Sequence, residues 1–182
     1  MARRSRVRSG TFFLRKEQDT NGTTYAEGSI DVSSFVNVLE GELLRVKQVW
    51  FSWTSDNGGP VAGTDVRASG AVQGASAVAC VNTQSQTSIK GFTSNALMAK
   101  NTLYAHVDST ANIDMITNET SVNPVDYDDG YLVATDGIFL GINQSAVDTW
   151  ASDIRCSIML ECEIVKLSLT DAQAVLVSQT VG

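Results

Sequence analysis

The clearest alternation of hydrophobic and polar positions lies near the C-terminus, in residues 154–169, IRCSIMLECEIVKLSL. Apolar residues occupy every second position from Ile154 to Ile164, and polar residues fill most of the positions between them. Met159 departs from this rule, because it is an apolar residue on the polar side. Strict alternation over this length predicts a long strand with one buried face.

A second alternating segment covers residues 42–54, ELLRVKQVWFSWT. Leu44 and Val46 share one parity, whereas Val49, Phe51 and Trp53 take the other. The change of phase at residues 47–48 predicts a β-bulge or a strand that is buried on both faces toward its end. The following residues, SDNGGP, are turn formers and end the strand.

Shorter candidate strands cover residues 10–17, 24–32, 77–82, 102–107 and 131–140. Stretches rich in turn-forming residues, such as DTNGTT, VNTQSQTS and YDDGY, lie between them. Many short strands separated by such stretches are typical of an antiparallel β-sandwich or barrel. We therefore expect an all-β fold, an antiparallel sandwich of the single jelly-roll kind with short helical turns.

Two short helices are also predicted. Thr170 and Gln173 have the spacing of a capping box, which would begin a C-terminal helix. A competing interpretation makes residues 173–181, QAVLVSQTV, one more strand. A weaker signal, Ser145 followed by Asp148, predicts a helical turn before the last long strand.

The chain has 182 residues, the length of one domain. Its charged residues are distributed unevenly along the sequence. Residues 1–16 carry a charge of +6 and no carboxylate, whereas residues 17–182 carry −13. The expected organisation is a basic N-terminal arm over residues 1–16, a β-sandwich over 17–169 and a C-terminal segment over 170–182. The arm would attract polyanions that the remainder repels.

The sequence offers few groups for catalysis. His106 is the single histidine, which excludes multi-histidine metal sites, and the common nucleotide-binding and hydrolase motifs are absent. Cys80, Cys156 and Cys162 form no CxxC pair and are expected to be buried small apolar residues. No apolar run is long enough for a membrane span. We therefore expect a protein that is not an enzyme, with carboxylate-only catalysis as a remote alternative.

Two other groups of residues are candidates for binding. Asp126, Asp128 and Asp129 could contribute oxygen ligands to Ca²⁺, although an exposed turn explains the same residues. Apart from this ion, no cofactor is expected. Trp50 and Trp53 have opposite parity on one strand, so at most one of them should face solvent and stack on a sugar or base.

The arm is the strongest candidate for a binding function. Its cationic residues are Arg3, Arg4, Arg6, Arg8, Arg15 and Lys16. Guanidinium groups form paired hydrogen bonds with phosphates. The first ten residues contain no aromatic side chain, and the arm has no motif that reads bases. The arm therefore predicts sequence-independent binding of nucleic acid. A solubilising tail and a cleaved transit peptide are the alternatives.

The chain resembles single jelly-roll viral capsid proteins, such as those of satellite and small single-stranded DNA viruses. Three features carry the resemblance: the arginine-rich start (Arg3, Arg4, Arg6, Arg8), the strand GELLRVKQVWFSW and the closing strand IRCSIMLECEIVKL. The resemblance is one of layout and spans the chain. It implies eight strands in two sheets, self-assembly of many copies into a shell, a place in the virion and an arm that touches the genome. The alternative is a β-sandwich module that binds a glycan or a protein through exposed aromatic rings near Trp50 or Trp150.

Overall fold

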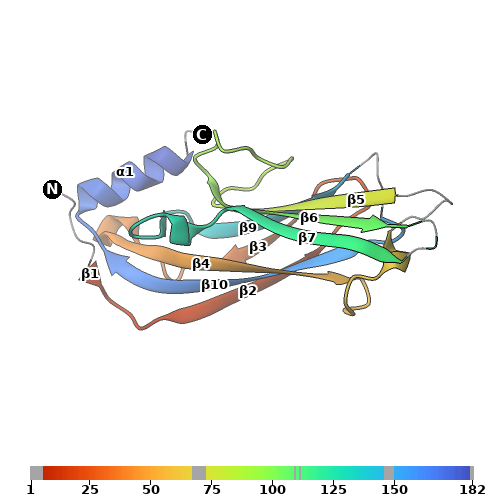
Figure 1. Cartoon of the computed structure of the whole chain (residues 1–182). Helices are drawn as coiled ribbons and strands as arrows, with labels where there is room; N and C mark the ends of the chain where they lie inside the picture. Colours follow the sequence, from red (N-terminus) through yellow and green to blue (C-terminus); the bar gives the residue numbers. More distant parts are fainter. Residues whose placement is uncertain (1–5, 67–72, 109, 111, 146–149, 181–182) are drawn as a thin grey trace.

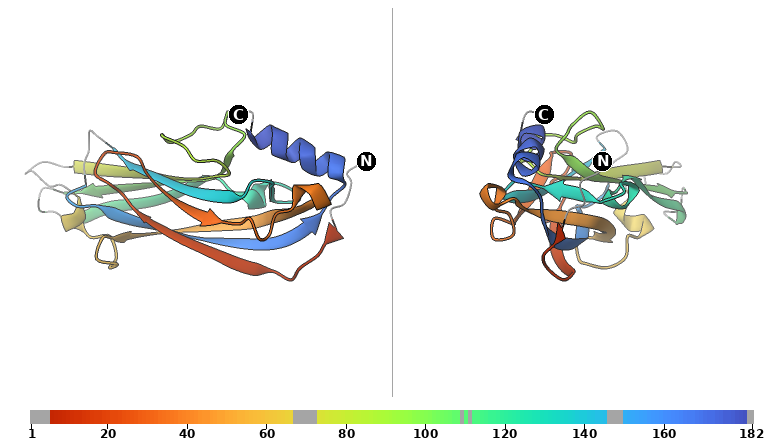
Figure 2. Two further views of the ribbon diagram at one scale, coloured as in Figure 1. Left: turned by 180° about the vertical axis from the view of Figure 1, so that it is seen from behind. Right: turned by 90° about the vertical axis from the view of Figure 1, so that its left-hand side faces the viewer.

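Two antiparallel sheets pack face to face in the computed structural model, which describes residues 6–66, 73–108, 110, 112–145 and 150–180. Figures 1 and 2 show an elongated sandwich with the helix α1 at one end, close to β1. The elements are β1 (Arg6–Val7), β2 (Phe12–Asp19), β3 (Ala26–Asp31), η1 (Val38–Glu40), β4 (Glu42–Ser55), η2 (Gly63–Asp65), β5 (Gln73–Asn82), β6 (Leu97–Val107), β7 (Ile113–Val122), η3 (Pro124–Asp126), β8 (Tyr131–Val133), β9 (Gly137–Gln144), β10 (Ile154–Lys166) and α1 (Leu169–Thr180).

The strand pairing is that of a long hairpin folded over on itself. At its middle, β5 pairs with β6; moving outward, β4 pairs with β8, β3 with β9, and β2 with β10. The chain therefore passes from one sheet to the other at most connections, which leaves β2, β10, β4 and β8 in one sheet and β3, β9, β5 and β6 in the other. This is the jelly-roll arrangement, and it confirms the predicted fold class.

The two segments with the strongest alternation form the longest antiparallel pair, β4 with β10. Gln48 lies opposite Glu161 and Val46 lies opposite Cys162, so Lys47 has no partner in the register. The predicted bulge is therefore present at Lys47. It places Val46 and Val49 in the core even though their parities differ.

Buried apolar side chains between the sheets form one large cluster, and a smaller cluster forms around Trp150. Cys80, Cys156 and Cys162 are buried free thiols, as expected for small apolar residues. Burial raises the pKa of Cys162 to about 12 and raises that of Cys156 as well. These thiols are therefore neutral core residues at ordinary pH.

Three features differ from the sequence-based expectations. The predicted strand over residues 131–140 is two strands, because β8 joins the sheet of β4 while β9 joins the sheet of β3. Strand β7 had no predicted counterpart. The helix α1 is present, so the competing strand is wrong, but its first turn is capped by Ser168, whose Oγ accepts from the Asp171 N–H at 3.2 Å.

Helix α1 is fixed to the sandwich through a buried glutamine. The Gln179 side chain accepts from the Ala134 N–H at 3.0 Å and donates to the Leu132 carbonyl. No described helix has the length and apolarity that a bilayer crossing requires. The helical turn predicted after Ser145 falls on residues 146–149, which lie outside the described residues, so it stays a prediction.

Candidate nucleic-acid interface and surface sites

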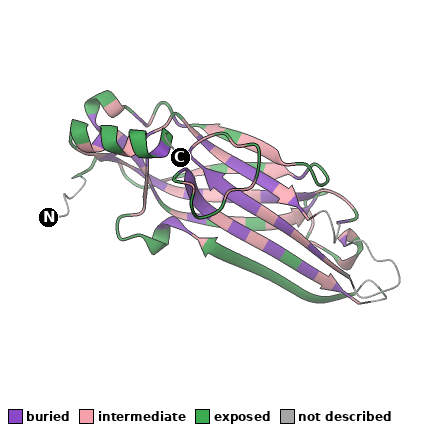
Figure 3. Ribbon diagram, turned by 90° about the horizontal axis from the view of Figure 1, so that it is seen from above, coloured by how far each residue is buried: buried purple, intermediate pink, exposed green. Residues whose placement is uncertain are grey.

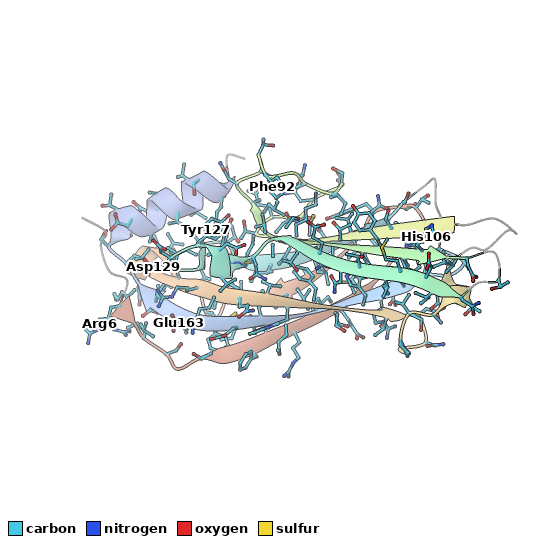
Figure 4. All side chains as sticks on the ribbon, in the orientation of Figure 1. Arg6, Phe92, His106, Tyr127, Asp129 and Glu163 are labelled. Carbon is cyan, nitrogen blue, oxygen red and sulfur yellow. The ribbon has the colours of Figure 1, made fainter. Side chains whose placement is uncertain are left out.

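Four of the six cationic residues of the predicted arm lie among the described residues. Arg6 is exposed in β1, opposite Lys166 of β10. Arg8 has an exposed side chain with a guanidinium nitrogen 3.5 Å from the Glu42 carboxylate. Its backbone N–H donates to the Ile164 carbonyl at 2.8 Å. The backbone of residues 6–8 is therefore fixed against β10 while both arginine side chains reach solvent (Figure 4 labels Arg6).

Arg15 and Lys16 belong to β2, where alternate Phe12 and Leu14 side chains pack on the core. Arg15 is exposed beside Met159, whereas Lys16 points to the other side of the strand and is half-buried. The Lys16 side chain lies against Gly28 of β3, where an added Cβ would come within 2.6 Å of Lys16 Cε. The cationic side chains thus occupy separate places on the surface. Arg3 and Arg4 lie outside the described residues, and the boundary at residue 16 stays a prediction.

The candidate calcium ligands turn toward different partners. The Asp126 carboxylate accepts from the Asn123 N–H at 3.0 Å and caps η3, while Asp129 Oδ1 lies 3.8 Å from an Arg45 nitrogen. Asp128 is exposed. In the described parts of the chain, no three His, Cys, Asp or Glu side chains converge in a way that could hold a metal ion. All three carboxylates are exposed, and the calcium site stays a prediction.

The tryptophans follow the parity argument. Trp53 points inward and its Nε1–H donates to Asn101 Oδ1 at 2.7 Å, whereas Trp50 is 36% exposed. The Trp50 ring lies 6.3 Å from that of Phe13 on the outer face of the sheet. Trp150 is only 5% exposed and donates to the Ser76 carbonyl at 3.1 Å, so the expectation of an aromatic platform at Trp150 is wrong.

His106 is a half-exposed residue of β6. Its Nδ1 lies 3.4 Å from Asp114 Oδ2 of the neighbouring strand β7. Met115, a thioether, is the residue directly opposite in the register. The contact therefore joins two strands and offers no activated nucleophile.

A nearly buried ion pair was missed by the sequence analysis. Arg45 Nε donates to Glu163 Oε1 at 2.6 Å, and both side chains are about nine-tenths buried. Two residues farther along each strand, Lys47 and Glu161 form a more exposed ion pair, with Lys47 Nζ 2.7 Å from Glu161 Oε1. The sequence signal was available only as opposite charges on the polar sides of two strands, because the register that joins them is not readable from one sequence.

A hollow with a volume of about 480 Å³ lies beside α1. We call it the α1-end pocket. It is lined by Phe92, Leu97, Val122, Tyr127, Tyr131 and Val175, with the polar side chains of Ser94, Asn95, Ser178 and Gln179 among them. None of the described residues that line it carries a charge. Nothing in the sequence marked this pocket, because its residues come from four separate segments.

Comparison with known proteins adds the fold but no family. No protein-family profile and no curated protein sequence matches the chain. Among solved structures, VP1 of Trichodysplasia spinulosa-associated polyomavirus, determined with sialylated glycooligomers, aligns over 89% of this chain and 98% of its own, with a TM-score of 0.51 and 7% identity. A Desmodium yellow mottle tymovirus chain aligns at a TM-score of 0.27 and 12% identity, over 89% of this chain and 94% of its own.

Both neighbours are jelly-roll viral capsid proteins. At 7% identity, the likeness to the polyomavirus protein concerns the fold alone. The chain therefore has a capsid-type jelly-roll fold, and the predicted resemblance is confirmed at that level.

Proposed function

We propose that this protein is a structural, non-enzymatic viral coat protein whose copies assemble into the shell of a virion. The observation that carries the proposal is the jelly-roll fold of strands β2 through β10, which aligns with a viral capsid protein over 89% of the chain. Many copies of one domain close a shell through repeated contacts that are individually weak, and the repetition supplies the stability.

We further propose that the N-terminal cations contact the packaged genome. Residues 17–182 carry −13 and repel phosphates, so attraction must come mainly from residues 1–16. Arg6 and Arg8 project from β1 and its flank with their backbone fixed. Arg3 and Arg4 stand two to three residues before Arg6 in the sequence. Arg15 and Lys16 contribute less, because Glu17 lies on the same exposed side of β2 as Arg15, and the Lys16 side chain lies against Gly28.

Such contacts carry no base specificity and depend strongly on salt. Six cations that neutralise phosphates of a single strand give a slope of about −4 in log affinity against log salt concentration. The affinity of one copy is therefore small at physiological salt, and a shell that presents many copies binds its genome through multivalency.

The test replaces Arg3, Arg4, Arg6 and Arg8 together by glutamine, which removes four charges and keeps the backbone pairing of β1. Particles of this variant should assemble but contain much less nuclease-protected nucleic acid, measured by absorbance at 260 and 280 nm after nuclease treatment. A matched comparison replaces two arginines of the arm, Arg3 and Arg4, or two cations outside the arm, Arg67 and Lys90. The first pair should lower the packaged nucleic acid more than the second.

Two results would contradict the proposal. Equal nucleic-acid content in wild-type particles and in particles of the four-arginine variant would show that the arm does not bind the genome. A wild-type protein that forms no particle at any ionic strength or concentration would remove the role as a coat protein.

A further inference from the structure

Exposed apolar side chains gather at the α1 end of the sandwich. Leu39 is 81% exposed and Phe92 is 68% exposed, and Val125, Tyr127, Leu169 and Val177 are exposed around them. The exposed residues of α1 include no charged side chain. Figures 3 and 4 show the exposed outer side of this helix and, next to it, Phe92 and Tyr127. A concentration of apolar surface of this kind marks a protein contact.

One part of this surface is a projection. The turn of residues 37–41, which we call the Leu39 turn, holds its shape through two hydrogen bonds: Asn37 Oδ1 accepts from the Glu40 N–H at 3.3 Å, and the Gly41 N–H donates to the Val38 carbonyl at 3.1 Å. Gly41 has a φ of 74°, which favours glycine. Val38 packs against the core, so Leu39 and Glu40 are presented to solvent on a fixed backbone.

The other part is the α1-end pocket, whose walls are also fixed. The Tyr131 hydroxyl donates to the Asn95 carbonyl at 2.6 Å, and Gln179 is held by the backbone of β8. The lining is uncharged, but Lys100 Nζ lies 5.9 Å from the centre of the Phe92 ring at the rim. The pocket therefore suits an apolar side chain that has a carboxylate next to it.

The projection and the pocket lie on different sides of α1 within one molecule. Val175, Ser178 and Gln179 face the pocket, whereas Leu176 faces a second hollow beside Val38 and Leu39. The helix therefore separates the Leu39 turn from the pocket of its own chain. A different copy of the chain can bring the two together.

We propose that the Leu39 turn of one copy inserts Leu39 into the α1-end pocket of a neighbouring copy, with Glu40 placed beside Lys100. The inference rests on the proposed coat function and names one contact between its copies. Within the described residues neither Glu40 nor Lys100 forms an ion pair, so each is available to the other. Because the two surfaces differ, the contact is head-to-tail, and repetition about an axis closes a ring.

The sharpest test exchanges the two charges. Glu40→Lys and Lys100→Glu should each raise the concentration needed for half-maximal assembly about tenfold or more, because each places like charges together at the contact. The double variant Glu40→Lys/Lys100→Glu should return that concentration to within about threefold of wild type. Light scattering and sedimentation velocity measure the assembly, and circular dichroism checks the fold of each variant.

A second pair of variants tests the apolar part. Leu39→Ser should impair assembly as strongly as the charge reversals, whereas Tyr104→Ser, which replaces an exposed side chain of β6 toward the other end of the sandwich, should not. Normal assembly of Leu39→Ser, or a double charge exchange that assembles no better than its single variants, overturns this contact while the coat function stands. Binding of a small neutral sugar in the pocket with unchanged assembly also overturns it. A wild-type protein that stays monomeric at all concentrations overturns both proposals.

Discussion

Strands β10 and β7 are both long and both pair antiparallel with their neighbours, yet they differ in burial and in the number of strands beside them. β10 has β1 and β2 on one side and β4 on the other, and buried residues alternate with half-buried ones along most of its length. β7 ends its sheet beside β6, and all its residues from Ile113 to Ser121 are exposed. Figure 3 shows this strand as a nearly continuous exposed edge.

The difference shows that a hydrophobic pattern records burial and not backbone pairing. The sequence of β7, IDMITNETSV, has no regular alternation because neither of its faces packs on another element. What holds the strand is the ladder to β6, together with contacts such as Asn101 Nδ2 donating to Thr120 Oγ1 at 2.9 Å. A strand at an open edge is therefore invisible to the argument that identified β10.

The largest effect predicted from this comparison is that of Leu160→Ala in β10. Leu160 is fully buried between Leu14 and Val49 of the adjacent strands. The loss of its side chain should lower the free energy of unfolding by about 3 kcal/mol, from lost burial and the cavity that remains. Chemical denaturation of the unassembled protein measures the change.

The matched control is Ile116→Ala in β7, which removes a similar side chain that is half exposed. Its cost should stay below about 0.5 kcal/mol, as for most surface substitutions. Equal losses for the two variants would mean that β7 is buried in the molecule as it exists in solution, and the contrast between the two strands would fail.

Much of the fold could be predicted because most strands, like β10 and unlike β7, bury one face, and burial leaves an alternating pattern in the sequence. The alternation in β10 and β4, and even the bulge at Lys47, follows from which side chains enter the core. The split between β8 and β9 could not be predicted, because Tyr131, Leu132 and Val133 are apolar in either sheet and only the strand register assigns them. The cap of α1 was misplaced by two residues because Ser168 and Thr170 offer the same hydroxyl chemistry.

The surface sites were less predictable than the fold. The charge of residues 1–16 is a property of sequence, but the fixed positions of Arg15 and Lys16 depend on how β2 packs. The α1-end pocket and the ion pair between Arg45 and Glu163 join residues that are far apart in the chain. Proximity of this kind depends on strand order, which no local pattern in this sequence specifies.

The second prediction concerns that ion pair, which lies between β4 and β10. Replacing Glu163 by Ala leaves the guanidinium of Arg45 in a nearly buried position without its main partner. The free energy of unfolding should fall by about 2 to 3 kcal/mol, at the low end for a buried pair because Asp129 lies 3.8 Å away. Urea denaturation at neutral pH measures the loss.

A double replacement separates the cost of an unpaired charge from the value of the pair. Arg45→Met/Glu163→Leu should recover at least half of the loss, because two apolar side chains need no compensation for lost hydration. If the double variant is less stable than Glu163→Ala alone, the ion pair itself stabilises the protein. The assumption that the lost hydration of the two charges largely offsets their attraction is then wrong.

The smallest predicted effect returns to β7, at its connection from β6. The Asp108 carboxylate accepts from the Thr110 hydroxyl and from the Thr110 N–H, both at 2.8 Å, and from the Asn112 N–H at 3.0 Å. These hydrogen bonds, the one from the Thr110 hydroxyl first, lower the pKa of Asp108 to about 2. A carboxyl group whose pKa is lower in the folded state stabilises that state above its ordinary pKa of about 3.9.

That stabilisation should be lost as the pH falls from about 4 through about 2, when the carboxylate is protonated and no longer accepts these hydrogen bonds. The amide signals of Thr110 and Asn112 in NMR spectra should therefore titrate with a midpoint near 2, and the Asp108→Asn variant should lack this titration. A midpoint near 3.8 would show that the turn is not formed as described. Since β7 has no buried face to hold it, the turn, the ladder to β6 and side-chain contacts such as that of Asn101 with Thr120 fix this strand, and the NMR titration tests the turn directly.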